Sequence, residues 1–322
     1  METGMGRWPA ILLIALLVAA AGLPLVMPLG YIKDILFYVF LYIILGQGFN
    51  VLAGYAGLVS LGQAAFFGMG ALAGRMLWIA GLPFYLAIGA GGIAAMIVSA
   101  IIGFPCLRLK GAYFSMGTLA LTIICNLMAT NVFVTESFLP PAYMAGYSNT
   151  TRYYAALVLA LASTIMVWRL ASSRLGIGMI AVREDADAAG SLGVYVFRRK
   201  LQALLISAFT TGVAGALFAF YQVALYYYQG FSPLWSFDAI LVTFIGGSGT
   251  LFGPVLGAIF YVGLKEVFAL VLGKGHVVIF GIIFILVVLF FPRGLATVWE
   301  KLCLLATALR KTARHDVKRC EN

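Results

Sequence analysis

The side chains that most often carry catalysis are scarce in this sequence. Two histidines, His276 and His315, and four cysteines are the whole supply of imidazole and thiol groups. The cysteines show neither paired spacing nor a histidine cluster, which zinc sites and disulfide frameworks require. No G-x-x-x-x-G-K-[ST] phosphate loop, H-E-x-x-H or G-x-S-x-G motif occurs. We therefore expect a chain that is not an enzyme and binds no cofactor or metal of its own.

One charged stretch between apolar segments is suited to binding a partner. Within residues 172–200, Arg183, Glu184 and Asp187 lie off a narrow stripe of small and apolar residues that repeats with a helical period. The stripe consists of Met179, Val182, Ala186, Ala189 and Gly193. A surface helix of this kind suits docking into a groove on a cytoplasmic partner. The alternative is a loop helix that lies against its own membrane domain, and the residues leave both interpretations open.

Polar side chains inside the apolar segments are almost all uncharged. Gln63 and Asn126 are the stronger candidates for contact with a solute, because burying an amide without partners is costly. Asp34, Asp238 and the Lys265–Glu266 pair sit near predicted helix ends or breaks. No carboxylate is evident at mid-membrane depth, which disfavours a carrier driven by protons or sodium ions.

A membrane fold must position these residues. The chain of 322 residues is 63% hydrophobic and 10% charged, with a mean hydropathy of +1.04, whereas roughly a quarter of an ordinary globular chain is charged. So few charges cannot cover the surface of a soluble protein of this size. The composition predicts an all-α polytopic transmembrane bundle and excludes disordered, collagen-like and nucleic-acid-binding classes.

The apolar segments predict eight to ten membrane spans, since about 20 apolar residues cross a bilayer as a helix. The first resembles a signal peptide around Ala19–Ala21, but its apolar run continues to Leu29, which favours an uncleaved helix. Residues 237–291 are harder to divide: a run ending at Ile245 is too short to cross comfortably, and runs at 254–272 and 276–291 follow. The earlier spans are expected near 8–29, 34–53, 58–80, 84–106, 112–133, 153–170 and 202–226.

The basic residues predict the orientation of these spans. With both termini inside, 16 of the 21 Lys and Arg residues fall on the cytoplasmic side, as the positive-inside rule requires. The membrane domain is then expected over 1–295 and a basic cytoplasmic tail over 296–322. The exceptions on the outer side or within the membrane are Lys33, Arg75, Arg152, Lys265 and Lys274.

Two glycine-rich clusters interrupt the apolar pattern, one over 46–74 and one over 245–257. Gly70 and Gly74, and likewise Gly249, Gly253 and Gly257, fall four residues apart, a spacing that lets helix backbones approach closely in lipid. As whole clusters they predict broken helices. Irregular backbone at membrane depth is tolerated when it is buried in protein or lines a cavity, and paired interruptions point to the pathway of a transporter or channel.

Several separated blocks resemble one family, the M-type permease subunits of bacterial branched-chain amino acid ABC transporters. The run Asn50 to Gly68 is similar to the signature of this family, and so are the run Arg108 to Phe114 and the loop Ser173 to Val194. Further blocks are Ser207–Phe209, Ala214–Leu217 and the Gly246–Gly257 break. The resemblance covers roughly residues 35–295 in the same order; the basic tail is not part of the pattern.

The resemblance implies a non-catalytic membrane subunit of an importer in the bacterial inner membrane. It would pair with a second, related permease, two cytoplasmic ATP-binding subunits that hold the ATP and magnesium, and an external substrate-binding protein. Related permeases carry urea, short amides and other amino acids, so an importer of one of these is an alternative. A second alternative is an autonomous channel for small neutral solutes. The implied coupling residues are Arg183, Glu184, Asp185, Asp187, Ala189, Gly190 and Gly193. The implied translocation-path residues are Asn50, Gly54, Gly57, Gln63, Gly246, Gly247 and Gly249, and Asn126 joins them as a buried amide.

Overall fold

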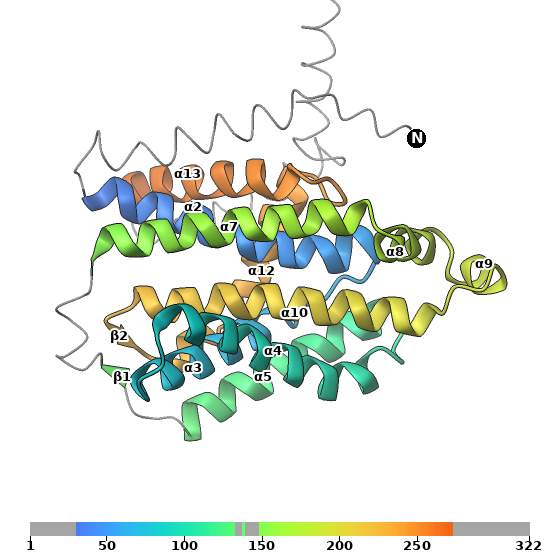
Figure 1. Cartoon of the computed structure of the whole chain (residues 1–322), viewed down its shortest axis with the longest axis horizontal. Coiled ribbons are helices and arrows are strands. Elements are labelled where there is room, and N and C mark those ends of the chain that lie inside the picture. Colours follow the sequence, from blue (N-terminus) through green and yellow to red (C-terminus); the bar gives the residue numbers. More distant parts are fainter. Residues whose placement is uncertain (1–29, 133–136, 139–147, 273–322) are drawn as a thin grey trace, which may run out of the picture.

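The structure, a computed structural model, describes residues 30–132, 137–138 and 148–272. Within them the chain is a bundle of long helices, which confirms the all-α polytopic class (Figure 1). Among the described residues, five helices are long and apolar enough to cross a membrane. The expected spans at 8–29 and 276–291 and the basic tail at 296–322 lie outside the described residues.

Most predicted spans coincide with helices. α4 spans Phe84–Cys106, α5 spans Ala112–Val132 and α7 spans Asn149–Ala171. α2, over Gly30–Phe49, continues directly into a π-helical segment, η1, over Asn50–Tyr55. These boundaries follow the apolar runs because a helix satisfies all its backbone hydrogen bonds internally, which lipid demands.

The starts of two predicted spans differ most from the structure. α3 spans Gln63–Ile79 and so begins five residues later than expected, because the Gly57–Gly62 stretch is not helical. α10 spans Val196–Tyr221 and so begins earlier than expected. Its first turns include Arg198–Lys200, which hydropathy had excluded from the predicted span. A helix can continue past the apolar region into water, so its charged first turns carry no hydropathy signal.

The difficult region after α10 contains two helices separated by the second glycine break. α12, over Leu234–Gly246, has 13 residues and is about 20 Å long, which confirms that it is too short to cross. α13 follows over Gly253–Leu272. Before them, β2 (Ala224–Leu225) pairs antiparallel with β1 (Ser137–Phe138), and the single turn α11 covers Tyr227–Gly230.

The continuous helix expected in the charged loop was wrong. Two helices replace it: α8 spans Arg174–Glu184, and α9 covers only Ala186–Ser191. Asp185 separates them because its extended backbone stops α8 while its carboxylate accepts from the N–H groups of Asp187 and Ala188, as an N-cap does. Gly193, at φ +85°, closes α9 with its N–H on the Gly190 carbonyl.

Close helix packing is concentrated where glycines face each other. α10 packs against α3, α4 and α2, and at Gly70 of α3 a Cβ atom would lie only 2.0 Å from the Gly212 carbonyl oxygen. Gly74 faces Ala216 in the same way, so the predicted Gly70–Gly74 contact face is confirmed. Gly253 and Gly257 likewise approach α12, but Gly249 lies in the break, outside α13.

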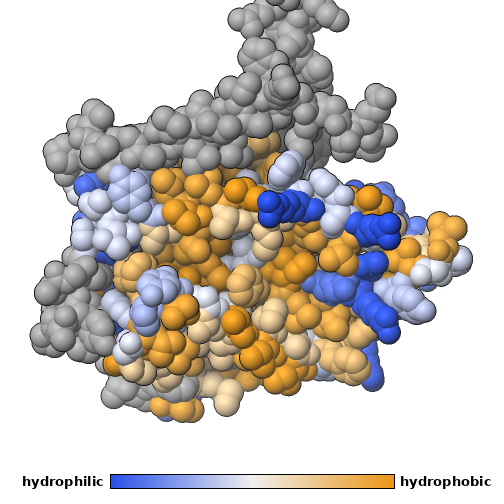
Figure 2. All heavy atoms as spheres, in the orientation of Figure 1, coloured by the Kyte–Doolittle hydropathy of each residue, from blue (hydrophilic) through white to orange (hydrophobic). Residues whose placement is uncertain are grey.

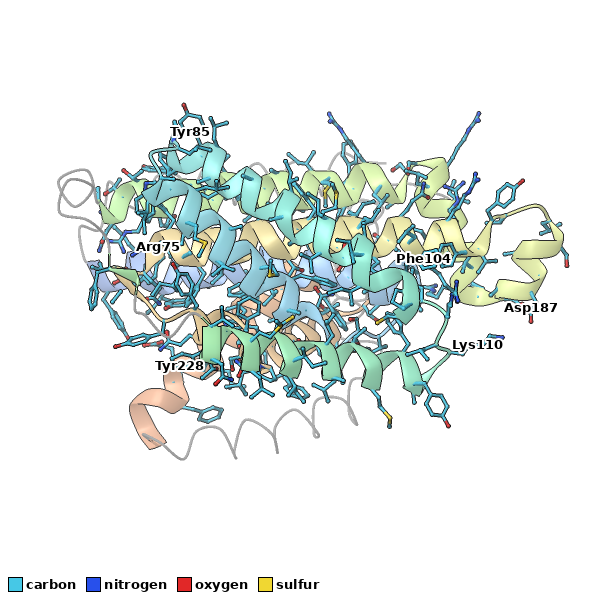
Figure 3. All side chains as sticks on the ribbon, turned by 90° about the horizontal axis from the view of Figure 1, so that it is seen from below. Arg75, Tyr85, Phe104, Lys110, Asp187 and Tyr228 are labelled. Carbon is cyan, nitrogen blue, oxygen red and sulfur yellow. The ribbon has the colours of Figure 1, made fainter. Side chains whose placement is uncertain are left out.

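The surface separates an apolar belt from two polar ends. Figure 2 shows hydrophobic atoms across the middle of the bundle and hydrophilic ones around α8 and the start of α10. Arg108 and Lys110 follow α4 at this same end, where Figure 3 places Lys110 and Asp187. The structure thus gathers at one end the basic residues of 108–200 that the sequence assigns to the cytoplasm.

The opposite end of α10 is capped by two arginines within the bundle. Arg75 of α3 is fully buried and donates to the carbonyls of Gln222 (3.1 Å) and Val223 (2.8 Å). Arg152 of α7 donates to the carbonyl of Tyr221 (3.0 Å). These cations satisfy carbonyls that the end of a helix leaves unpaired and interact favourably with its dipole.

Replacing Arg75 with methionine should lower the stability of the protein by about 2 kcal/mol or more, because it leaves the part-buried carbonyls of Gln222 and Val223 unpaired, at about 1–3 kcal/mol each. Thermal unfolding of the detergent-purified protein measures this. Arg108→Met is the matched control, since Arg108 is exposed and stacks over Phe104, and it should change stability little. Equal melting of the two variants would contradict the capping role.

Candidate functional site

The two glycine breaks, predicted separately, meet in the structure. Asn50, at the start of η1, donates from Nδ2 to the Thr250 carbonyl (2.9 Å) and accepts at Oδ1 from the Gly249 N–H (2.7 Å). One turn earlier, Gln47 donates to the Leu251 carbonyl (2.9 Å). These amides satisfy backbone groups of the irregular segment between α12 and α13. We call this contact, η1 with residues 247–252, the break junction.

Arg183 of α8 joins the charged loop to the break junction. Its guanidinium donates to the Gly54 carbonyl in η1 (2.5 Å) and also pairs with Glu184 (2.5 Å). A Cβ atom built at Gly249 would lie 3.1 Å from the same guanidinium, so Arg183 lies beside the second break as well. Gly57 and Gly249 adopt φ of +70° and +79°, which favours glycine. The coupling candidate thus contacts path candidates that lie far from it in the sequence.

Three of the five residues in the stripe of the charged loop face the protein itself. Met179, Val182 and Ala189 are buried within the chain, whereas Glu184, Asp185 and Asp187 are exposed. Gly190 and Gly193 are exposed as well. The surface that α8–α9 offers to a partner therefore combines these carboxylates with the exposed Ile177 and Leu192, while Met179, Val182 and Ala189 anchor the pair of helices to the bundle.

The other predicted path residues lie mostly in helix packing. Gln63 is buried and donates to Ser207 (2.9 Å) while accepting from Thr211 (2.7 Å), so it links α3 to α10. Gly246 and Gly247 are buried where α12 meets α13. Asn126 differs: it donates to the Tyr228 carbonyl (3.0 Å) and lines a cavity.

This cavity, of about 780 Å³, lies at the end of the bundle opposite α8–α9. Its lining comes from α2 between Tyr31 and Tyr42, from Asn126 of α5, the end of α10, residues 228–235, α12 and α13. Figure 3 shows Tyr228, one of its lining residues, far from Asp187 and Lys110. If the basic end is cytoplasmic, the cavity faces the outside of the cell.

The cavity contains charged side chains that contact one another through tyrosines. Asp238 of α12 accepts from the hydroxyls of Tyr42 (2.9 Å) and Tyr261 (2.5 Å). Lys265 of α13 donates to the same Tyr42 hydroxyl (3.1 Å). At the first turn of α2, Tyr31 donates to Glu266. We call Tyr42, Asp238, Tyr261 and Lys265 the polar cluster.

Sequence reasoning set these ionisable residues aside as lying near helix ends. The structure places Tyr42 twelve residues after Gly30, about 18 Å along the helix, so the polar cluster lies well inside the bundle. A signal was present: Asp238 and Lys265 interrupt apolar runs in which charge is costly. Asp238 does lie near the start of α12, as expected, but its hydrogen bond to Tyr42 places its carboxylate within the bundle.

Comparisons with known proteins agree with this architecture. A family model described as the permease component of branched-chain amino acid transport systems matches residues 31–288. The high-affinity branched-chain amino acid permease protein LivM of Escherichia coli K12 is 31% identical over 88% of this chain and 74% of its own. A probable LivM of Methanocaldococcus jannaschii is 24% identical over 74% of this chain and 81% of its own. No solved structure matches significantly.

Proposed function

The chain belongs to the family of permease components of branched-chain amino acid transport systems, and we propose that it carries branched-chain amino acids inward by alternating access. It is a multi-pass membrane protein and a permease subunit of an ABC importer. The observation that carries the mechanism is Arg183, which links an exposed charged helix pair to both breaks of the membrane helices.

The coupling step follows from this geometry. The exposed carboxylates of α8–α9 bind a groove on a cytoplasmic ATP-binding subunit, and movement of that subunit displaces α8. Arg183 then transmits the displacement to the Gly54 carbonyl and to the second break. Because η1 and residues 247–252 lack regular helix geometry, they are the segments of the bundle best able to change conformation.

The partners follow from the same proposal. The chain holds no phosphate loop, so ATP and magnesium bind to two cytoplasmic ATP-binding subunits. A second, related permease completes the membrane part, and an external substrate-binding protein delivers the amino acid to the cavity end. We propose that the assembly lies in the bacterial inner membrane, and the basic residues gathered at the α8 end support an orientation with α8–α9 inside.

Reversing Glu184 and Asp187 together to lysine should abolish amino acid uptake, because it turns the exposed acidic face of α8–α9 basic and repels a groove built for carboxylates. Uptake of radiolabelled leucine into proteoliposomes with the partner subunits, binding protein and ATP measures this. Lys110→Glu reverses a charge at the same end outside α8–α9 and should transport normally. Wild-type uptake by the doubly reversed variant, inserted at normal levels, would refute the coupling role.

The competing function, an autonomous channel for small neutral solutes, predicts different results. A channel conducts without ATP or partner subunits, and the same reversal in α8–α9 would leave its flux unchanged. Solute flux through the purified chain alone, without ATP, would favour the channel. Buried packing of Gln63 and the break junction favours the importer, because neutral polar residues that were expected to line a pore instead join helices.

A further inference from the structure

The cavity is of a size and composition suited to a small molecule with both charge and apolar surface. Its volume of about 780 Å³ lies within the roughly 300–1,000 Å³ typical of small-molecule sites. It is lined by one ammonium, Lys265, and three carboxylates: Asp34, Asp238 and Glu266. Ionisable residues inside membrane helices are costly and commonly functional, and the coupling step at α8–α9 makes no use of these.

Lys265 has hydrogen-bonding capacity beyond its contacts in the described structure. Its ammonium carries three donors, and one donates to the Tyr42 hydroxyl. The rings of Tyr42 and Tyr261 lie 5.4 and 5.6 Å from Nζ, so the cation is held over two aromatic faces. This fixes the position of a positive charge that still has donors for an incoming carboxylate.

Asp238 offers the complementary group. Each of its oxygens accepts one tyrosine hydroxyl, and a carboxylate oxygen has room for a second donor. The two hydroxyls come from α2 and α13, so Asp238 is held in place from both sides. A ligand ammonium can therefore bind to Asp238 without displacing either tyrosine.

Apolar side chains complete the lining beside these charges. Phe218 and Trp235 contact each other edge to face, with ring centroids 5.0 Å apart, and Val262 lies on the same helix as Lys265. These surfaces favour an aliphatic group. The full apolar lining is Ile35, Phe218, Pro233, Leu234, Trp235 and Val262.

We propose, resting on the importer function above, that this cavity is a binding site within the permease for a zwitterionic amino acid with an aliphatic side chain. Lys265 binds its carboxylate, Asp238 binds its ammonium, and the aromatic and aliphatic lining receives its side chain. The permease thereby binds both charged groups of the solute after the external binding protein has released it, and so contributes to substrate selectivity. A solute that lacks one of the two charges forgoes the charge-assisted hydrogen bond to Lys265 or to Asp238 and therefore binds more weakly.

Leucine binding to the purified transporter, without the external binding protein, tests this site. Equilibrium binding of radiolabelled leucine to the full assembly in lipid nanodiscs gives a Kd. Lys265→Met and Asp238→Asn should each raise that Kd about tenfold or more, as expected when a charge-assisted hydrogen bond is lost. Isoamylamine and 4-methylpentanoate, which each lack one charge of leucine, should compete poorly. Basal ATP hydrolysis by the same preparations shows that the variants fold and assemble.

Lys33→Met is the matched control, because Lys33 lies on α2 at the same end, donates to Thr150 and does not line the cavity. Its Kd should stay within about twofold of wild type. Unchanged leucine affinity in both cavity variants, or a wild-type assembly that transports leucine yet binds none in the permease, would overturn the site while leaving the importer function intact. A wild-type assembly that transports no amino acid would overturn the proposed function and this site with it.

Discussion

Replacing Arg183 with methionine should reduce leucine uptake about tenfold or more while the assembled transporter still hydrolyses ATP. Arg183 connects α8 to the Gly54 carbonyl and lies beside Gly249. Methionine retains an aliphatic stem but has no donor, and a hydrogen bond from a charged group contributes about 1.5–3 kcal/mol. ATP-driven movement of α8–α9 would then no longer reach the breaks. Parallel uptake and ATPase assays in proteoliposomes separate these two activities.

Arg198→Met is the control for loss of a cation at this end. Arg198 is exposed on the first turn of α10 and lies over the Tyr195 ring, away from the break junction, so its variant should transport at close to the wild-type rate. An Arg183→Met assembly that imports leucine as fast as wild type would show that coupling does not pass through this contact.

Replacing Gly215 with valine should prevent the permease from accumulating in folded form. A Cβ atom at Gly215 of α10 would lie 1.9 Å from the Phe67 carbonyl oxygen of α3, well inside van der Waals contact. The obstacle is backbone, which no side-chain rotation can relieve, and α3, α4 and α10 all pack together here. Overpacking costs about 1–3 kcal/mol even where side chains can shift. Fluorescence-detected size-exclusion chromatography of the tagged chain measures the yield of monodisperse protein.

Gly89→Val provides the matched control on the neighbouring helix α4. A Cβ atom at Gly89 would meet no described atom within 4 Å, so valine is tolerated in the apolar belt and the yield should match wild type. If the Gly215 and Gly89 variants gave equal yields and elution profiles, close backbone packing of α3 against α10 would not be essential to the fold.

The sequence alone determined the features that depend on local composition. Apolar runs placed α4, α5 and α7 nearly at their boundaries, because each residue's transfer into lipid and the length of the run decide where a helix spans. Glycine content located both breaks, and the short run before Ile245 correctly indicated a helix that does not cross. A helix boundary was harder to predict where charged residues extend the helix into water, as at Arg198–Lys200 in the first turns of α10.

The tertiary structure decided which of these features meet. Asn50 and Thr250 lie 200 residues apart and are joined by a hydrogen bond; neither break by itself specifies the other as its partner. The stripe of α8–α9 could have faced a partner or its own bundle, and only packing shows that Met179 and Val182 are buried inside the chain.

The polar cluster shows the same division most clearly. The sequence shows Asp238 and Lys265 as isolated charges in separate apolar runs. Hydropathy indicates only that placing each charge in the membrane is energetically costly. Tyr42 brings them together, since it donates to Asp238 and accepts from Lys265 across three helices. Hydropathy is a property of each residue, so it can be read directly from the sequence. Hydrogen bonding between helices depends on how they cross and rotate, and those angles are set by packing of the whole bundle.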